Sequence, residues 1–163
     1  MNRYIGIDPG SKGAIAIIDD FSRVLGVYDL NSDISTYWYA ATYLVDPTET
    51  FKNTYVVVED VCGRPGQSCV ANTTFMKLAG YAELTGFFLG EMMKVKPQKW
   101  KKLFGLVFGK ELTKTQKKHK SIELAKEFFP SEADKLTASK DGRAEALLIA
   151  KYCQLLTRGL LDD

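Results

Sequence analysis

The sequence has only one histidine, His119, and three cysteines, Cys62, Cys69 and Cys153, none of them in a C-x-x-C pair. This scarcity excludes histidine-rich metal sites and most Ser-His-Asp or Cys-His catalytic schemes, and it argues against zinc sites and disulfides. No apolar run approaches the ~20 residues that cross a bilayer. The N-terminus lacks the pattern of a signal peptide, so we expect a cytoplasmic protein with no membrane partner. Any chemistry must use carboxylates, lysines, hydroxyls or a hard metal ion.

The 163 residues are 45% hydrophobic and 26% charged, which predicts a single domain spanning residues 1–163. The net charge of +2 hides a strong segregation, because residues 94–120 hold ten lysines and one acid, Glu111. That stretch carries +9 and the remainder −7. Such a basic segment indicates either a polyanionic partner or a solvated, lysine-rich helix face. Trp100 and Phe104, which lie among the lysines, favour a packed surface that holds the lysines in place.

Apolar residues follow strand and helix periods along the chain. The first three expected strands are separated by short turns and should form an antiparallel meander. The run Val56-Val57-Val58 lacks alternation, as in a parallel strand that is buried on both faces. The fold class is therefore α/β: a mixed sheet of three antiparallel strands plus parallel strands, with helices on both faces. We expect strands at 3–8, 14–18, 24–30, 54–60 and 92–96, helices at 34–45, 72–89, 97–104, 113–129 and 141–158, and loops at 63–68, 105–110 and 131–140.

Four acids stand at informative places in this pattern. Asp8 ends the first expected strand and Glu59 ends the valine strand, so both would emerge at one sheet edge if these strands are parallel neighbours. Asp141 and Glu145 lie four residues apart on the last helix, which places their Cβ atoms ~6 Å apart on one face. Each acid alone is more typical of a turn, a strand end or a helix N-terminus than of a catalytic site. The four together favour a site.

Four converging carboxylates without basic partners would bind a hard cation such as Mg²⁺ or Mn²⁺. Two such ions ~3.5–4 Å apart can activate a water and stabilise the leaving oxygen of a phosphodiester. This hypothesis requires the last helix to reach the ends of the two strands.

The motifs around these acids resemble a known family. The chain resembles the RuvC-like Holliday junction resolvases of the ribonuclease-H-like superfamily, most of all their short phage-type members, over nearly its whole length. The resemblance rests on the order in which the motifs occur, since each of them alone is weak. The motifs are Ile5-Gly6-Ile7-Asp8-Pro9-Gly10-Ser11, Val57-Val58-Glu59-Asp60, Pro65-Gly66-Gln67, the segments 95–102 and 125–130, and residues 141–150 from Asp141 to Ala150.

The resemblance implies a ribonuclease-H-like fold and a homodimer that cleaves four-way DNA junctions symmetrically, with two Mg²⁺ or Mn²⁺ ions per subunit. It makes Asp8, Glu59, Asp141 and Glu145 the metal ligands and the catalytic residues. A phage-encoded protein of this kind would act in the host cytoplasm. Lys101 and Lys114 match basic positions that act near the scissile phosphate or hold DNA, and the expected DNA-binding residues are Lys101, Lys114, Lys117, Lys118 and Arg64.

Two positions depart from the family pattern. Bacterial relatives usually end with two aspartates three residues apart, whereas Asp141 and Glu145 are four apart, which affects metal preference. Some relatives carry an aromatic residue three places after the strand glutamate, where it stacks on a base, and this chain has Cys62 there. Arg64 and Phe75 are the candidates to replace that aromatic side chain.

Three other functions stay open at this level. Another ribonuclease-H-like nuclease would act on flaps, branched DNA or RNA–DNA hybrids. An actin-like ATPase or sugar kinase also begins with an apolar strand that ends in Asp and Gly, but it needs two such domains, so we expect no nucleotide cofactor. A non-catalytic junction-binding protein is disfavoured, because acids near a DNA path weaken binding unless metals neutralise them.

Overall fold

Five strands form one mixed sheet in the computed structural model, which describes residues 1–44, 52–63, 66–109 and 111–161. The strand order is β3-β2-β1-β4-β5. The first three strands are antiparallel, while β4 and β5 run parallel to β1. This confirms the predicted meander and the predicted fold class. The strands are β1 (Arg3–Asp8), β2 (Ala14–Asp19), β3 (Val24–Asp29), β4 (Thr54–Glu59) and β5 (Glu91–Val95).

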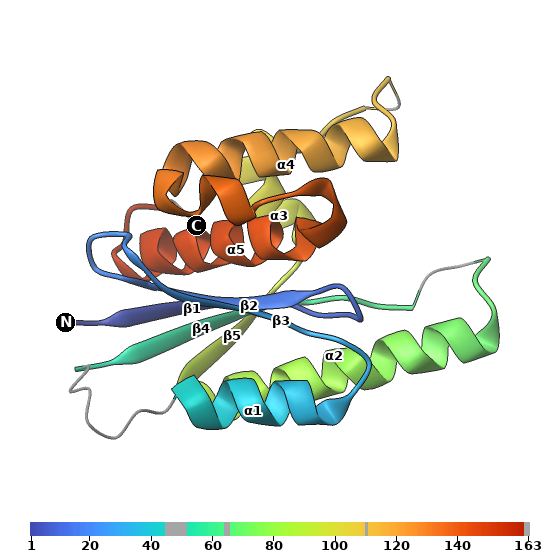
Figure 1. Cartoon of the computed structure of the whole chain (residues 1–163), viewed down its shortest axis with the longest axis horizontal. Coiled ribbons are helices and arrows are strands. Elements are labelled where there is room, and N and C mark those ends of the chain that lie inside the picture. Colours follow the sequence, from blue (N-terminus) through green and yellow to red (C-terminus); the bar gives the residue numbers. More distant parts are fainter. Residues whose placement is uncertain (45–51, 64–65, 110, 162–163) are drawn as a thin grey trace.

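Helices cover both faces of this sheet (Figure 1). One face is covered by α1 (Ile34–Leu44) and α2 (Cys69–Leu89), and the other by α3 (Pro97–Leu103), α4 (Lys114–Phe128) and α5 (Asp141–Thr157). Alternate residues of β4 belong to different apolar clusters, since Val57 packs on the α5 side and Val56 and Val58 pack on the α2 side. The valine strand is therefore buried on both faces, as predicted.

Two of the helices, α2 and α4, begin at side-chain capping residues. The α2 helix begins at Cys69, three residues before the predicted start, because the Ser68 side chain accepts a hydrogen bond from the Ala71 N–H. At the start of α4, Thr113 and Gln116 form the reciprocal bonds of a capping box. The predicted end of the first helix at 45–47 lies outside the described residues.

The segment 131–140, predicted as a loop, is instead mostly helical. Two 3₁₀ helices, Pro130–Lys135 and Ala138–Lys140, cover most of it, with Leu136 and Thr137 between them. Pro130 favours the first turn of a helix because its φ is already fixed there. Leu136 is buried in the core beside α5, so the segment packs against the fold rather than projecting from it. Across the described ranges, no helix combines the length and the apolar character that crossing a bilayer requires.

The helix α5 lies unusually close to the sheet because two glycines leave room for it. A Cβ atom on Gly6 would overlap the backbone of Ala146 and Ala150, and one on Gly142 would overlap the Lys12 carbonyl. Both substitutions would force α5 away from β1 and from the turn that follows it. These two glycines therefore set how near the acids of α5 come to the end of β1.

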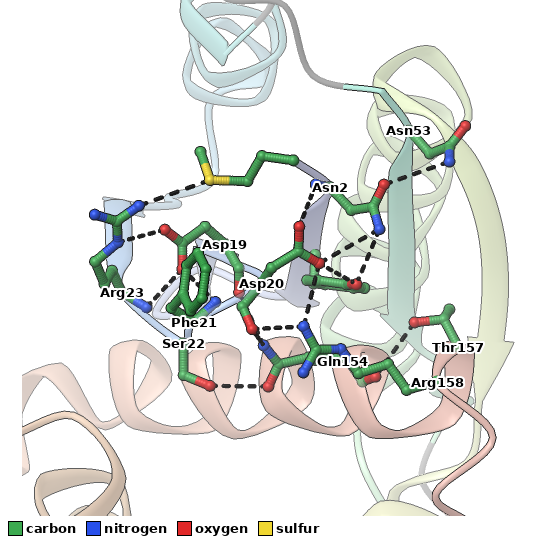
Figure 2. Close-up of polar contacts among 12 residues, drawn as sticks. Asn2, Asp19, Asp20, Phe21, Ser22, Arg23, Asn53, Gln154, Thr157 and Arg158 are labelled. Carbon is green, nitrogen blue, oxygen red and sulfur yellow. Dashed lines mark hydrogen bonds and ion pairs between the residues drawn. The ribbon is translucent and has the colours of Figure 1, made fainter.

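A polar network fixes the other end of α5 to the turn after β2 (Figure 2). The Gln154 amide donates to the backbone carbonyls of Asp19 and Asp20, and its carbonyl oxygen accepts from Ser22. Arg158 forms an ion pair with Asp20, whose pKa falls to about 2, first because the Asn2 N–H donates to it. With one end anchored here, the first turns of α5 are held in place at the opposite sheet edge.

Candidate metal centre

Asp8 and Glu59 emerge together because their strands are parallel neighbours. Ile7 of β1 is in register with Val58 of β4, and each acid follows directly at the end of its strand. Glu59 is buried and Asp8 is partly buried. The predicted meeting of the two carboxylates at one sheet edge is therefore confirmed.

The third carboxylate comes from α5, one turn after the helix begins. Asp8, Glu59 and Glu145 each offer an oxygen, and these three oxygens all lie within 4.8 Å of one another. Buried Ala144, Ala146 and Leu147 surround Glu145 along the helix, so the carboxylate is held at the margin of the core. The last helix thus reaches the strand ends, as the metal hypothesis requires.

The carboxylates of the cluster carry an excess of negative charge that a cation would neutralise. Burial raises the pKa of Asp8 well above its ordinary value, and the charges of Glu145 and Glu59 raise it further. Lys101 lowers it only in part. Three hard oxygen donors with excess negative charge are the ligand set that Mg²⁺ and Mn²⁺ prefer. The residues present therefore fit a divalent ion.

One element of the prediction was wrong: the four acids were expected to have no basic partners, but two of them pair with lysines. The Lys101 ammonium lies 3.3 and 3.2 Å from the two oxygens of Glu145, and the Lys118 ammonium lies 2.5 Å from Asp141. Burial alone would lower the pKa of Lys101, but the charges of Glu145 and Glu59 outweigh it and raise that pKa. Asp141 is therefore held by Lys118 beside the group of three, and its charge still raises the pKa of Asp8.

One residue that sequence reasoning did not assign to the site is Trp100. Its side chain is fully buried, and its indole N–H donates a hydrogen bond of 2.9 Å to Glu59. A buried tryptophan needs an acceptor for its N–H, and this need was the one feature of the sequence that could have indicated a polar partner for Trp100. What the sequence could not supply was the path of the chain from β5 into α3, which returns Trp100 to the end of β4.

The carboxylates line a cavity of about 900 Å³ that opens to solvent. Phe75 from α2 and Cys62 from the segment after β4 lie on its wall. Phe75 is thus an aromatic ring beside the acids, whereas Arg64, the other candidate to replace the missing aromatic residue, lies outside the described residues. The cavity also contains Lys101 and Lys96 from the start of the basic segment.

The remaining candidate DNA-binding lysines lie on α4. Lys117 donates to the backbone carbonyls of Phe108 and Gly109, which holds the loop before the helix. Lys118 pairs with Asp141, as described above. Lys114, at the first position of α4, is exposed and forms no hydrogen bond or ion pair with another described residue.

Comparisons with known proteins identify the fold. No protein-family model and no curated protein sequence matches this chain. Two solved structures of Thermus thermophilus RuvC are similar to it, each at 15% sequence identity. The structure in complex with a Holliday junction substrate has a TM-score of 0.61 and covers 98% of this chain and 97% of its own, and the second has a TM-score of 0.57 and covers 96% of both. The chain therefore has a RuvC-type, ribonuclease-H-like fold.

Proposed function

We propose that this chain is a metal-dependent, structure-selective endodeoxyribonuclease that resolves four-way DNA junctions by paired phosphodiester hydrolysis. The observation that carries the proposal is the convergence of Asp8, Glu59 and Glu145 on a fold similar to that of a protein solved with a Holliday junction. The sequence motifs favour a phage-type member of the RuvC-like resolvases, in which residues 1–163 would form a single nuclease domain.

The proposed site residues have distinct tasks. Asp8, Glu59 and Glu145 would hold two Mg²⁺ or Mn²⁺ ions. Asp141 would complete the ligand set by exchanging its ion pair with Lys118 for a bond to a metal ion. The ions, when bound, would supply Lewis-acid chemistry for phosphodiester hydrolysis. Lys101 would turn its ammonium from Glu145 toward the DNA phosphate that enters the cavity. Phe75 would stack on a base at the crossover, in place of the aromatic residue that some relatives have at the position of Cys62.

The basic segment would carry the DNA arms. Contacts from Lys114, Lys117 and Lys118 to phosphates, together with Arg64, would be largely blind to sequence and strongly dependent on salt. A two-fold symmetric dimer suits a substrate that must be cut twice, and the exposed apolar residues of α1 and α2 are where we place its interface.

A cleavage assay on a panel of substrates tests the proposal. A labelled four-way junction, a flap, a Y-structure and a linear duplex of the same sequence are each incubated with Mg²⁺ or Mn²⁺. We expect symmetric cuts in the junction and little cutting of the duplex. Preferential cutting of the flap would indicate the related ribonuclease-H-like nuclease instead, and junction binding without cutting under either metal would indicate a binding module.

A further inference from the structure

The second tryptophan of the chain, Trp100, touches the candidate metal centre through a single polar atom. Its Nε1–H donates to Oε1 of Glu59 at 2.9 Å, and both side chains are buried. A buried carboxylate tolerates few orientations when one of its oxygens accepts a hydrogen bond from a rigid ring. The bond therefore restricts the direction in which Glu59 presents its carboxylate to Asp8 and Glu145.

The backbone fixes the position of the indole. Val95, the last residue of β5, is in register with Glu59, and the Asp60 N–H donates to the Val95 carbonyl at 2.8 Å. Pro97 then begins α3 only two residues later, and Trp100 follows within the first turns of that helix. The donor and its acceptor are thus joined through a short, hydrogen-bonded stretch of chain.

Packing prevents the ring from moving. The Trp100 ring meets Phe104 edge to face at 6.5 Å, and Phe104 in turn meets Phe128 of α4. The Lys101 ammonium, which also bonds Glu145, lies 4.8 Å from the centre of the Trp100 ring. One turn of α3 therefore supplies a donor to Glu59 and another to Glu145.

We infer that Trp100 is a positioning residue for the metal centre, which orients the Glu59 carboxylate for a divalent ion. The inference rests on the proposed function, since it assumes that Glu59 is a metal ligand. Loss of a donor that hydrogen-bonds to a metal ligand typically weakens metal binding by about 10- to 100-fold. A tryptophan that only filled the core would affect stability without affecting metal affinity.

Calorimetric titration with Mn²⁺ in the absence of DNA separates these roles. We expect Trp100→Phe, which keeps an apolar ring and removes the N–H, to bind Mn²⁺ about 10- to 100-fold more weakly than the unsubstituted protein. Phe129→Leu is the matched control, because Phe129 is buried in the same apolar cluster and should lose stability only. Equal Mn²⁺ affinity for Trp100→Phe and the unsubstituted protein would overturn the inference while leaving the proposed nuclease intact. If the unsubstituted protein binds no Mn²⁺, both the inference and the proposed function fail.

A second measurement avoids any change at Trp100. The chain has two tryptophans, and Trp38 is exposed on α1, so Trp38→Phe leaves one indole N–H resonance for NMR. Mg²⁺ should shift that resonance, and the shift should saturate at the same Mg²⁺ concentration as a calorimetric titration of this variant with Mg²⁺. An unchanged resonance with calorimetric binding present would contradict the inference.

Discussion

At the scale of single residues, Asp8 combines partial burial with three acidic neighbours, and its pKa lies well above its ordinary value, first because of burial. The folded protein thus holds the Asp8 proton more tightly than the unfolded chain. Without metal, the free energy of unfolding therefore falls as pH rises from the ordinary pKa of 3.8 through the raised one. An uncharged residue at this position escapes that loss.

We expect Asp8→Asn to abolish junction cleavage while junction binding is retained or tightened, because the variant loses metal affinity and a negative charge near DNA. In metal-free buffer at neutral pH its thermal midpoint should exceed that of the unsubstituted protein by a few degrees, and the difference should vanish toward pH 4. Mn²⁺ should raise the midpoint of the unsubstituted protein only. Normal cutting by Asp8→Asn would show that the site is misassigned.

Asp29→Asn provides a control of opposite sign. The Arg143 guanidinium donates to Asp29, with Lys140 as a second partner, and together they lower the pKa of Asp29. The stability that this acid contributes is present above its ordinary pKa and is lost as pH falls through the lowered one. Asp29→Asn should therefore lower the thermal midpoint at neutral pH and leave metal binding unchanged.

The residues that the sequence made predictable are those whose position follows from the end of an element. Asp8 and Glu59 are the last residues of apolar strands, so their meeting required only that the two strands be parallel neighbours. The lysine partners of Glu145 and Asp141 depend on how α3 and α4 lie relative to α5, and the bond from Trp100 to Glu59 depends on how α3 lies at the end of β4. Those contacts join residues far apart in sequence, and no local pattern encodes them.

At the scale of elements, the contact between β1 and α5 decides whether Glu145 reaches Asp8. Gly6→Ala places a methyl group against the backbone of α5 and should lower the free energy of unfolding by about 1–3 kcal/mol. It should also weaken Mn²⁺ binding, because α5 must move outward. Denaturant unfolding and calorimetry measure the two effects.

Gly80→Ala is the matched control for this substitution. A Cβ atom on Gly80 meets no atom within 4 Å, and the residue lies inside α2. The change should therefore stabilise the protein by about 0.5–1 kcal/mol, the usual gain in a helix, without altering metal binding. Gly6→Ala with unchanged Mn²⁺ affinity would show that the spacing of α5 does not control the metal centre.

The α4 helix supplies the test of DNA contact, because Lys114 is exposed at its first position. If Lys114 contacts a phosphate, Lys114→Ala should flatten the slope of log affinity against log salt by about 0.9. Lys126, exposed in the last turn of the same helix, gives the control Lys126→Ala, which should leave the slope unchanged. An unaltered slope for Lys114→Ala would show that this lysine does not contact the DNA phosphates.

Among the elements, the strands and the long helices were predictable because apolar periodicity and capping residues are local. The segment 131–140 was not predictable, since its polar composition is typical of a loop and the burial of Leu136 in the core is a tertiary contact. The sequence also could not show which of the ten lysines of segment 94–120 bond to protein groups and which face solvent, because this depends on tertiary contacts. Lys101, Lys117 and Lys118 all bond protein acceptors.

At the scale of the whole molecule, the layer of α1 and α2 has an exposed surface with little charge. Within 34–44 there is no charged residue, and α2 carries only Lys77 and Glu83. An apolar face with one charge of each sign can meet an identical copy without net repulsion, and exposed apolar patches often mark interfaces. The large exposed apolar side chains of this surface include Ile34, Trp38, Leu84, Phe87 and Phe88.

We therefore expect the protein to be a dimer through this face and Phe88→Glu to make it monomeric, because a carboxylate facing its own copy across a two-fold axis is strongly unfavourable. Light scattering after size exclusion measures the mass. On a plasmid with one extruded cruciform, the dimer should cut both strands and yield linear DNA, whereas the monomer should yield nicked circles. Phe21→Glu, at an exposed position in the turn after β2, is the control and should remain dimeric. A Phe88→Glu protein that stays dimeric and still linearises the plasmid would place the interface elsewhere.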